Sequence, residues 1–276
     1  MKKFTVKENC SLKDFTDATY PQGSFAYARL LKRGDIKVNG VRVRSDLSLA
    51  AGDEVIFYTT PQEEGRISHT VIYEDGNILV ADKLGGVSSE ALFSELSGCG
   101  NYYPVHRLDR NTVGLIVLAK NGPTEEALIA AFKERAVDKT YLCLCKNGFK
   151  ESRAVLTAYL KKNAEAGKVR VYATPEQDRV KVVTEYEVVK SYGDYCLVKV
   201  ILHTGKTHQI RAHLAFIGCP VLGDEKYGDF ALNKKYCATR QILVAKSLSF
   251  NLTGELAYLN GKQFTSNFFP RLPSAE

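Results

Sequence analysis

Three short segments of the chain gather charged, amide and hydroxyl side chains beside strongly apolar sequence. They span residues 106–112 (HRLDRNT), 139–141 (KTY) and 204–211 (TGKTHQIR). Polar groups in such places either form structural ion pairs and turns or line a reactive site at the edge of the core. Their residue types suit acid–base or nucleophilic chemistry by a carboxylate, with cations and amides that bind an anionic substrate.

Asp109 is the one carboxylate of the first segment, and Arg107 and Arg110 flank it closely. The apolar run 113–119 follows, so the carboxylate is expected at the rim of the core. A nearby guanidinium favours the ionised form of a carboxylic acid in such a place. A structural Asp–Arg pair that caps a turn explains the same residues, and local chemistry alone favours that alternative.

The third segment is expected to be neither a phosphate-binding P-loop nor a zinc site. Residues 205–207 (GKT) match the end of the P-loop motif, but Val200 stands where that motif requires a glycine. His208 and His213 are five residues apart, off a common helical face, and the chain has no HExxH motif. A nucleotide hydrolase is therefore the weakest of the candidate functions.

The third segment instead predicts a turn between a strand and a helix that is rich in hydrogen-bond donors. The N-terminus of the helix adds backbone N–H groups, which suit phosphate or a carbonyl-bearing base. The side chains expected to share in this surface are Lys206, Thr207, His208 and Gln209.

Tyr141 begins an apolar stretch two residues after Lys139. A buried core tyrosine is the ordinary interpretation, and only a neighbouring site would make the ring a platform for a stacked base. Cys143 and Cys145 follow in the same stretch, where strand geometry points both toward one face. A buried pair of thiols is therefore expected there.

The elements that must position these segments are mostly strands. Strands outnumber helices and show no regular strand–helix–strand rhythm, which predicts an α+β fold with a mixed, mainly antiparallel central sheet flanked by helices. The strands are expected over 71–73, 78–81, 114–119, 141–145, 180–189 and 196–203, and the helices over 124–132 and 208–216.

Residues 1–60 are expected to form a small α/β module of their own. A helical pattern through Leu30 ends at Gly34, and Asn39-Gly40 predicts a tight hairpin turn between short strands. Another strand is expected over 47–58, through a turn at Gly52. Cations that would give this module an RNA-binding face are Arg29, Lys32, Arg33, Lys37, Arg42 and Arg44, although a merely solvated surface explains them too.

A boundary between domains is expected just after this module. Residues 61–65 are polar and contain two residues that interrupt regular structure, Pro61 and Gly65. They are therefore expected to be a linker, and residues 66–276 to be one further domain.

Composition restricts the class of protein. The 276 residues are 45% hydrophobic and 25% charged, which is typical of a globular chain long enough for two domains. The formal net charge of +7 favours a polyanionic partner, although it also fits plain solubility charge. Short apolar runs and a charged N-terminal sequence argue against a membrane span or export. Seven scattered cysteines are expected as reduced thiols, as in the cytoplasm.

Together the three segments resemble the RluA-type RNA pseudouridine synthases, which modify bacterial large-subunit ribosomal RNA and some transfer RNA. Residues 1–60 are similar to the small RNA-binding domain first known from ribosomal protein S-four. The family resemblance covers about residues 66–250 and rests on the HRLD run at 106–109, Thr112, Gly114, the Lys139-x-Tyr141 pair, and 204–214 continuing into 218–224 (GCPVLGD) and Tyr227-Gly228.

The resemblance implies roles for particular residues. Asp109 would be the catalytic aspartate, Tyr141 would stack against the target base, and Arg211 would pair with Asp109. Arg107 would help to hold the site left by the extruded nucleotide, and Ile210 would pack on the opposite side of the base. The expected substrate-binding residues are Arg107, Lys139, Lys206, Thr207, His208, Gln209 and Ile210.

The implied activity is isomerisation of specific uridines to pseudouridine in structured RNA, with ribosomal RNA the first candidate and transfer RNA the second. It needs an aspartate but neither cofactor nor metal, and a cytoplasmic monomer that binds an RNA stem-loop is expected. The family's usual Lys-Pro-x-Gly is KLGG here, at 83–86, and Val113 and Lys206 replace a common serine and arginine. The altered turn motivates the alternative, a non-catalytic RNA-binding or ribosome-assembly protein on the same fold.

Overall fold

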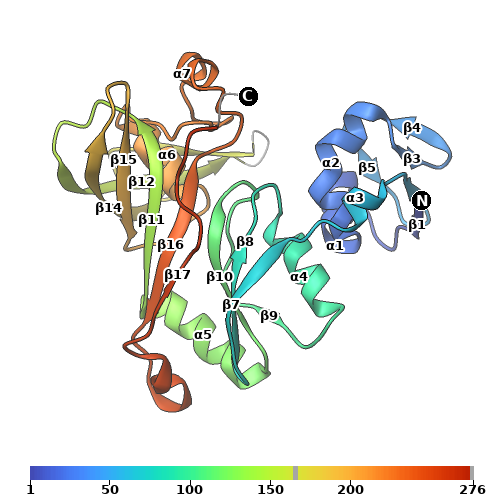
Figure 1. Cartoon of the computed structure of the whole chain (residues 1–276), viewed down its shortest axis with the longest axis horizontal. Coiled ribbons are helices and arrows are strands. Elements are labelled where there is room, and N and C mark those ends of the chain that lie inside the picture. The colour runs from blue at the N-terminus through green and yellow to red at the C-terminus, as the bar shows by residue number, and fades with distance from the viewer. Residues whose placement is uncertain (164–166, 274–276) are drawn as a thin grey trace.

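The computed structural model describes residues 1–163 and 167–273. A small sheet with two helices lies beside a much larger sheet with its own helices, and the segment that contains α3(Pro61–Glu64) connects the two parts (Figure 1). The fold is α+β with a large, mainly antiparallel sheet, as expected. No helix within the described ranges is long and apolar enough to cross a membrane.

The small N-terminal part contains a four-stranded sheet with the order β1-β6-β3-β4. Gly34 ends the second helix with a left-handed φ of 73°, and both residues of the Asn39-Gly40 turn have positive φ, as a type I′ hairpin requires. The single strand expected over 47–58 is wrong, because the left-handed Gly52 turn divides it in two. The elements are β1(Lys2–Thr5), β2(Cys10–Ser11), α1(Leu12–Thr19), α2(Pro21–Arg33), β3(Ile36–Val38), β4(Val41–Val43), β5(Ser48–Leu49) and β6(Glu54–Phe57).

The expected linker, residues 61–65, contains one turn of helix. The Thr60 side chain accepts a hydrogen bond from the N–H of Glu63, and the Glu63 side chain accepts one from the N–H of Thr60. This capping box and the proline in the first turn favour a helix start, so Pro61 begins regular structure here instead of interrupting it.

The larger part is built on a sheet of 11 strands within the described residues. Its order is β13-β12-β14-β15-β11-β16-β10-β8-β7, with β9 and β17 beside this path, and only β10 and β16 pair in parallel. Its elements are β7(His69–Glu74), β8(Ile78–Lys83), α4(Ser89–Ser97), β9(Tyr103–Pro104), β10(Val113–Ala119), α5(Gly122–Glu134), β11(Val137–Lys146), β12(Arg153–Asn163), β13(Lys168–Tyr172), β14(Val180–Ser191), β15(Tyr195–Leu202), α6(Gln209–Phe216), α7(Phe230–Lys235), β16(Leu243–Phe250), η1(Gly254–Leu259) and β17(Gln263–Thr265).

Alternate residues of the central strands face two separate cores. In β8, Leu79 and Ala81 belong to the core that α4 and α6 cover, whereas Ile78 and Val80 belong to the core that α5 covers. The sheet therefore has helices on both faces, and the cavity described below lies on the α6 side.

One local prediction, the buried pair of thiols, is confirmed, and another, the start of helix α5, is wrong. Cys143 and Cys145 are both buried with their Sγ atoms 3.3 Å apart, as predicted, and all seven cysteines are free. Helix α5 begins at Gly122 and not at Thr124, because the Asn121 side chain accepts a hydrogen bond from the N–H of Thr124 at 2.9 Å. Asparagine is a preferred N-cap, so the cap moves the start of the helix two residues earlier.

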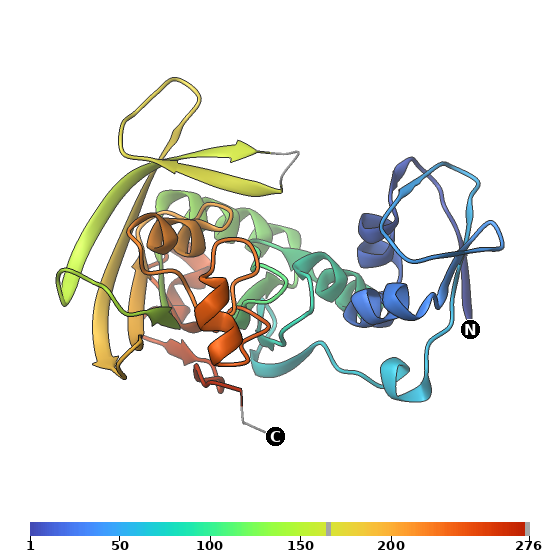
Figure 2. The same cartoon turned by 90° about the horizontal axis from the view of Figure 1, so that it is seen from above.

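An ion pair joins the N-terminal part to the larger part, where α1 and α2 lie against α4 (Figure 2). Arg110 donates to both carboxylate oxygens of Asp17, at 2.7 and 2.8 Å, and to the carbonyl of Ser24 at 3.0 Å. Burial opposes the charge on Asp17, but Arg110 and the Ser24 hydroxyl hold its pKa below the ordinary value. Both bonds to Asp17 come from Nη2 of Arg110, and these charge-assisted contacts fix the orientation of one part on the other.

We expect Asp17→Asn to weaken this docking, because it leaves the Arg110 guanidinium without its carboxylate. The free energy of unfolding in urea should fall by about 2–3 kcal/mol, and brief trypsin treatment should cleave faster after Arg66. Asp14→Asn removes an exposed carboxylate from the same helix and is the control. Equal stability and equal cleavage of the two variants would contradict a docking role for the pair.

Candidate active site

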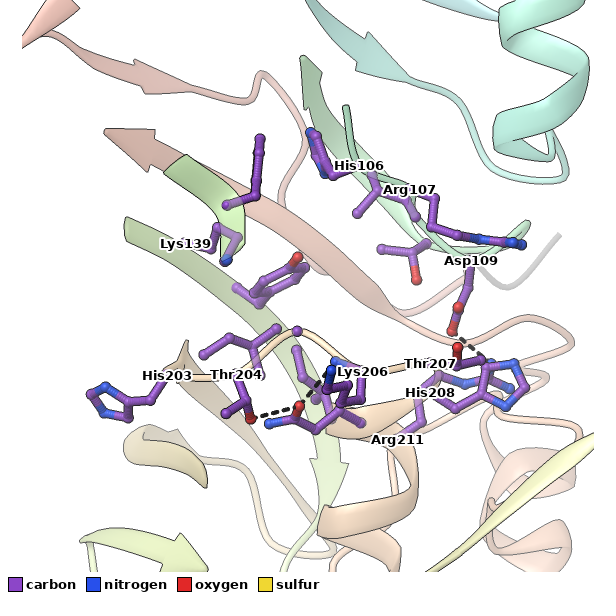
Figure 3. A pocket seen from close by; sticks show the side chains of 18 of the residues that line it. His106, Arg107, Asp109, Lys139, His203, Thr204, Lys206, Thr207, His208 and Arg211 are labelled. Carbon is purple, nitrogen blue, oxygen red and sulfur yellow. Dashed lines mark hydrogen bonds and ion pairs between the residues drawn. The ribbon is translucent and has the colours of Figure 1, made fainter. Parts of the chain in front are cut away.

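The three polar segments meet around one cavity of about 490 Å³. Figure 3 shows Asp109 with its neighbours, Lys139, and the turn before α6 facing this space from different elements. Every residue that the sequence placed at the site lines the cavity: Arg107, Asp109, Lys139, Tyr141, Lys206, Thr207, His208, Gln209, Ile210 and Arg211.

A single guanidinium joins two carboxylates at one end of the cavity. Arg211 donates from Nη1 to Oδ2 of Asp109 at 2.8 Å, and from Nε and Nη2 to the two oxygens of Asp224 at 2.7 and 2.9 Å. The exposed fraction of the side chain is 0% for Asp224, 6% for Arg211 and 23% for Asp109. Asp109 is therefore the most exposed member of the group, and Asp109 and Arg211 both line the cavity.

Asp224 acts as a fixed counter-charge for Arg211. Burial opposes the charge on Arg211, but Asp224 and Asp109 raise the pKa of the guanidinium above its ordinary value. Burial alone would raise the pKa of Asp224, yet Arg211 and two backbone N–H groups, those of Lys226 and Tyr227, bring it below the ordinary value. Both members of this buried pair are thus charged, and Nη1 of Arg211 stays directed at Asp109.

The arginines beside Asp109 in the sequence point away from it. Arg107 pairs with Glu90 at 2.9 Å, and Arg110 pairs with Asp17 in the other part of the chain. The N–H of Thr112 donates to the carbonyl of Asp109 at 3.0 Å, which closes a turn. The contact expected between Asp109 and Arg211 is present, whereas neither flanking guanidinium is the partner of this carboxylate.

Buried polar groups hold the loop that carries Asp109. Lys83 is fully buried and donates to three backbone carbonyls, among them that of Arg110 at 3.1 Å. Burial lowers the pKa of Lys83 to about 7, against the nearby charge of Asp109, which raises it. The Ser89 hydroxyl bonds both the N–H and the carbonyl of Leu108 at 2.9 Å. The lysine of the altered KLGG turn is therefore a structural support of the loop.

The strand that follows this loop requires a glycine. Gly114 has a φ of 109°, and a Cβ at this position would lie 2.3 Å from the carbonyl oxygen of Ala245. Only glycine permits this approach, which allows β10 to pair in parallel with β16. Gln241, just before β16, donates to Oγ1 of Thr112 at 2.7 Å and so ties the end of the loop to the same region.

Tyr141 from β11 and Ile210 from α6 supply apolar walls of the cavity. Both are buried, with 8% and 4% of their surface exposed, but the cavity reaches them. Burial and then the charge of Asp109 raise the pKa of Tyr141, so its hydroxyl stays protonated. The tyrosine is thus both a core residue and a wall of the cavity, and its stacking against a base stays a prediction.

The turn before α6 is held by one amide side chain. Oε1 of Gln209 accepts hydrogen bonds from the Thr204 hydroxyl and the N–H of Lys206, at 2.9 and 3.1 Å. Its Nε2 donates to the carbonyl of Val183 and the hydroxyl of Thr184, at 3.1 and 2.9 Å. All four hydrogen-bonding positions of the amide are therefore used within the protein. Of its neighbours in the turn, His208 has its Nδ1 2.9 Å from the Tyr227 hydroxyl, whereas the side chains of Lys206 and Thr207 make no hydrogen bond among the described residues.

Comparison with known proteins decides the family. A family model described as RNA pseudouridylate synthase matches residues 88–216. An RNA pseudouridine synthase of Aquifex aeolicus is 34% identical over 244 residues, which cover 79% of this chain and 76% of that protein. The chain belongs to the RNA pseudouridine synthase family. Ribosomal large subunit pseudouridine synthase C of Vibrio vulnificus is 31% identical to this synthase over 73% of the chain and 70% of that protein.

Solved structures agree on the fold. Human RNA pseudouridylate synthase domain containing 4 superposes with a TM-score of 0.58 and 22% identity, over 74% of this chain and 88% of that chain. Human RNA pseudouridylate synthase domain containing 1 gives the same TM-score with 23% identity, over 76% of this chain and 93% of that chain. The large sheet and its helices are thus the pseudouridylate synthase arrangement.

The cavity of this synthase is lined by further basic residues that the sequence pattern did not single out. Lys133 and Arg135 come from the end of α5, and His203 follows β15. Lys139 lies over the ring of Phe132 at 5.2 Å, and burial lowers its pKa. Lys133 and Arg135 precede Lys139 by only a few residues in the sequence. They reach the cavity because the chain turns from α5 into β11 at this point.

The N-terminal cations expected to bind RNA lie outside this cavity. Two of the six pair with a carboxylate, two donate to backbone carbonyls, and two have no ion pair among the described residues. Arg29 and Arg33 pair with Glu63, Arg42 and Arg44 donate to the carbonyls of Gly34 and Lys32, and Lys32 and Lys37 have no ion pair among the described residues.

We expect Asp224→Asn to loosen the site, because it removes the buried counter-charge of Arg211. The free energy of unfolding in urea should fall by about 3 kcal/mol, and the rate of pseudouridine formation should fall at least tenfold. Glu225→Gln removes the adjacent exposed carboxylate and should alter neither quantity. Wild-type stability and rate in Asp224→Asn would contradict the role of Asp224 as counter-charge.

We expect stability to decline in mild acid because of His213, a buried residue of α6 whose Nδ1 lies 3.0 Å from Oγ1 of Thr184. Burial lowers its pKa from 6.5 to about 4. Between these values the unfolded chain binds a proton here and the folded chain does not, so stability falls as the pH falls from 6.5 toward 4.

His213→Gln is the matching variant, since it can still bond Thr184 but does not titrate. The slope of its unfolding free energy between about pH 6 and pH 4.5 should be smaller by about 1 kcal/mol per pH unit. Urea titrations of both proteins at three pH values measure this difference, and equal slopes would show that His213 is not the group responsible.

Proposed function

We propose that this synthase converts specific uridines of structured large-subunit ribosomal RNA to pseudouridine, with Asp109 as its catalytic carboxylate. The observation that carries the proposal is the placement of Asp109, which faces the cavity while Arg211 and the buried Asp224 hold it from behind. Relatives named ribosomal large subunit pseudouridine synthase C support ribosomal RNA as the substrate, and transfer RNA is the second candidate.

The reaction rearranges one nucleotide, and no group enters or leaves overall. The N1–C1′ bond of uridine breaks, the uracil turns while it stays bound, and C5 bonds to C1′; the C5 proton is lost and N1 regains a proton. Asp109 either attacks C1′ and leaves when C5 returns, or removes a C2′ proton that is restored later. Both routes use a carboxylate at this position, and Nη1 of Arg211 lies 2.8 Å from Oδ2 of Asp109 as its counter-charge.

The target base must leave the RNA helix to enter the cavity. Unstacking costs a few kcal/mol, so the reaction favours loops and needs compensating contacts in the protein. In our proposal Tyr141 stacks on one face of the base and Ile210 packs on the other. Arg107, Lys139, Lys206, Thr207 and His208 bind the RNA around it, and Gln209 contributes by fixing the turn.

We also propose a role for each part of the chain. Residues 1–60 act as an RNA-binding module, 61–65 as the linker and 66–276 as the catalytic domain, in a monomer that works in the cytoplasm. Lys32 and Lys37 are the module's cations best suited to RNA, because no carboxylate among the described residues competes for them. The arginines of the module would have to exchange internal partners for phosphates.

We expect Asp109→Asn to abolish tritium release from RNA labelled at uridine C5, because an amide neither attacks C1′ nor removes a proton. RNA affinity should stay within about threefold of wild type. Asp138→Asn, which removes an exposed carboxylate near the cavity, is the control and should retain full release. Release by Asp109→Asn at the wild-type rate would refute the assignment, and RNA binding by wild type without any release would favour the non-catalytic alternative.

A further inference from the structure

Two arginines outside the catalytic cavity meet beside Gly86, where the N-terminal part rests on the catalytic part. A Cβ on Gly86 would lie 3.4 Å from Nη1 of Arg240 and 3.7 Å from Nη2 of Arg66. Both guanidinium groups therefore approach the same point from different segments. Residue 86 has no side chain of its own to place between them.

Arg66 is held in place without any carboxylate. Its Nη1 donates to the carbonyl of Phe25 in α2 at 2.9 Å, and its Nη2 donates to the carbonyl of Gly85 at 3.2 Å. Burial and then the cations Arg240 and Arg29 lower its pKa. A fixed guanidinium in an electropositive place is preorganised to receive an anion, because binding costs it little freedom of movement.

Arg240 has a fixed backbone and an unused side chain. A Cβ on Gly223 would lie only 1.9 Å from the carbonyl oxygen of Arg240, so the two backbones are packed directly together. The side chain is exposed and, within residues 1–163 and 167–273, makes no hydrogen bond or ion pair. Arg107 and Arg153, by contrast, are also exposed but pair with Glu90 and Glu185.

The place of this pair in the fold favours RNA over an acidic protein. The N–H of Gly86 donates to the carbonyl of Arg110 at 3.0 Å, so the arginines lie against the loop that carries Asp109. Arg66 donates to α2 of the N-terminal part, and Arg240 packs on Gly223 of the larger part, so the two guanidinium groups lie where the two parts meet. A phosphate matches two convergent guanidinium groups: Arg240 has all its N–H donors free among the described residues, and each Nη of Arg66 uses only one of its two N–H groups.

We infer that Arg66 and Arg240 form a binding site for one backbone phosphate of the substrate RNA, between the N-terminal part and the catalytic cavity. This inference rests on the proposed RNA substrate. It adds to the catalytic cavity a second site of RNA contact, which does not distinguish between bases. Its expected contribution is affinity and register, since phosphate contacts position a nucleic acid without specifying sequence.

Arg240→Ala tests the site, because this side chain has no partner whose loss would disturb folding, whereas Arg66 also joins the two parts. The probe is unmodified bacterial large-subunit ribosomal RNA made by transcription, with binding measured over a range of salt concentrations. Loss of one phosphate contact should weaken binding about five- to eightfold at 0.1 M salt and reduce the slope of log K against log salt by about 0.7–0.9. Arg240→Lys keeps the charge and should keep most of the slope.

Lys262→Ala is the matched control. It removes one exposed positive charge next to β17, which pairs with the far end of β16 from Arg240. Phosphate ethylation interference gives a second readout: ethylation at one position should impair binding by wild type but not by Arg240→Ala. Equal affinity, slope and interference pattern in Arg240→Ala and Lys262→Ala would overturn the inference.

Tritium release from C5-labelled RNA separates this inference from the proposed function. If wild type releases tritium and Arg240→Ala binds like the control, the phosphate site is wrong and the catalytic assignment stands. If wild type releases none while Arg240→Ala loses affinity and slope, the phosphate site is supported and the catalytic proposal fails.

Discussion

One guanidinium shared between two carboxylates is the interaction on which the site depends. Arg211 is oriented by the fully buried Asp224 and presents its remaining nitrogen to Asp109, which lies partly open to the cavity. A buried arginine with a single catalytic partner would lose its counter-charge whenever that partner reacted. In the reaction that we propose, Asp224 removes this difficulty, because the pair it forms with Arg211 persists while the charge on Asp109 changes.

Several elements of the fold hold the loop that carries Asp109 in place. Lys83 bonds the backbone on one side of Asp109, Ser89 bonds it on the other, and Gly114 lets the next strand lie directly against β16. These supports are buried polar contacts and a close backbone approach, and each is sensitive to small changes in shape. The apolar walls of the cavity then come from elements that the sheet core holds independently of the loop.

Local chemistry made part of this structure predictable. Gly34, the Asn39-Gly40 turn and the thiols at 143 and 145 follow from backbone preferences and strand alternation, and the structure agrees with each. The Asp109–Arg211 contact came from resemblance, because no local rule joins residues so far apart. The partners of Arg110 and Lys83 were out of reach for the same reason. The start of α5 and the helical turn at 61–64 were missed because side-chain caps outweighed the expected boundaries.

Asp109 and Arg110 are consecutive residues whose side chains serve different halves of the molecule. Asp109 faces the cavity, whereas Arg110 forms an ion pair with Asp17 in the N-terminal part. A single peptide bond therefore connects the carboxylate that we propose as catalytic to a residue held by the first helix of the chain. Removing the first 60 residues would take Asp17 away from Arg110 and leave an unpaired cation next to that carboxylate, so the excised fragment is no faithful substitute for the intact protein.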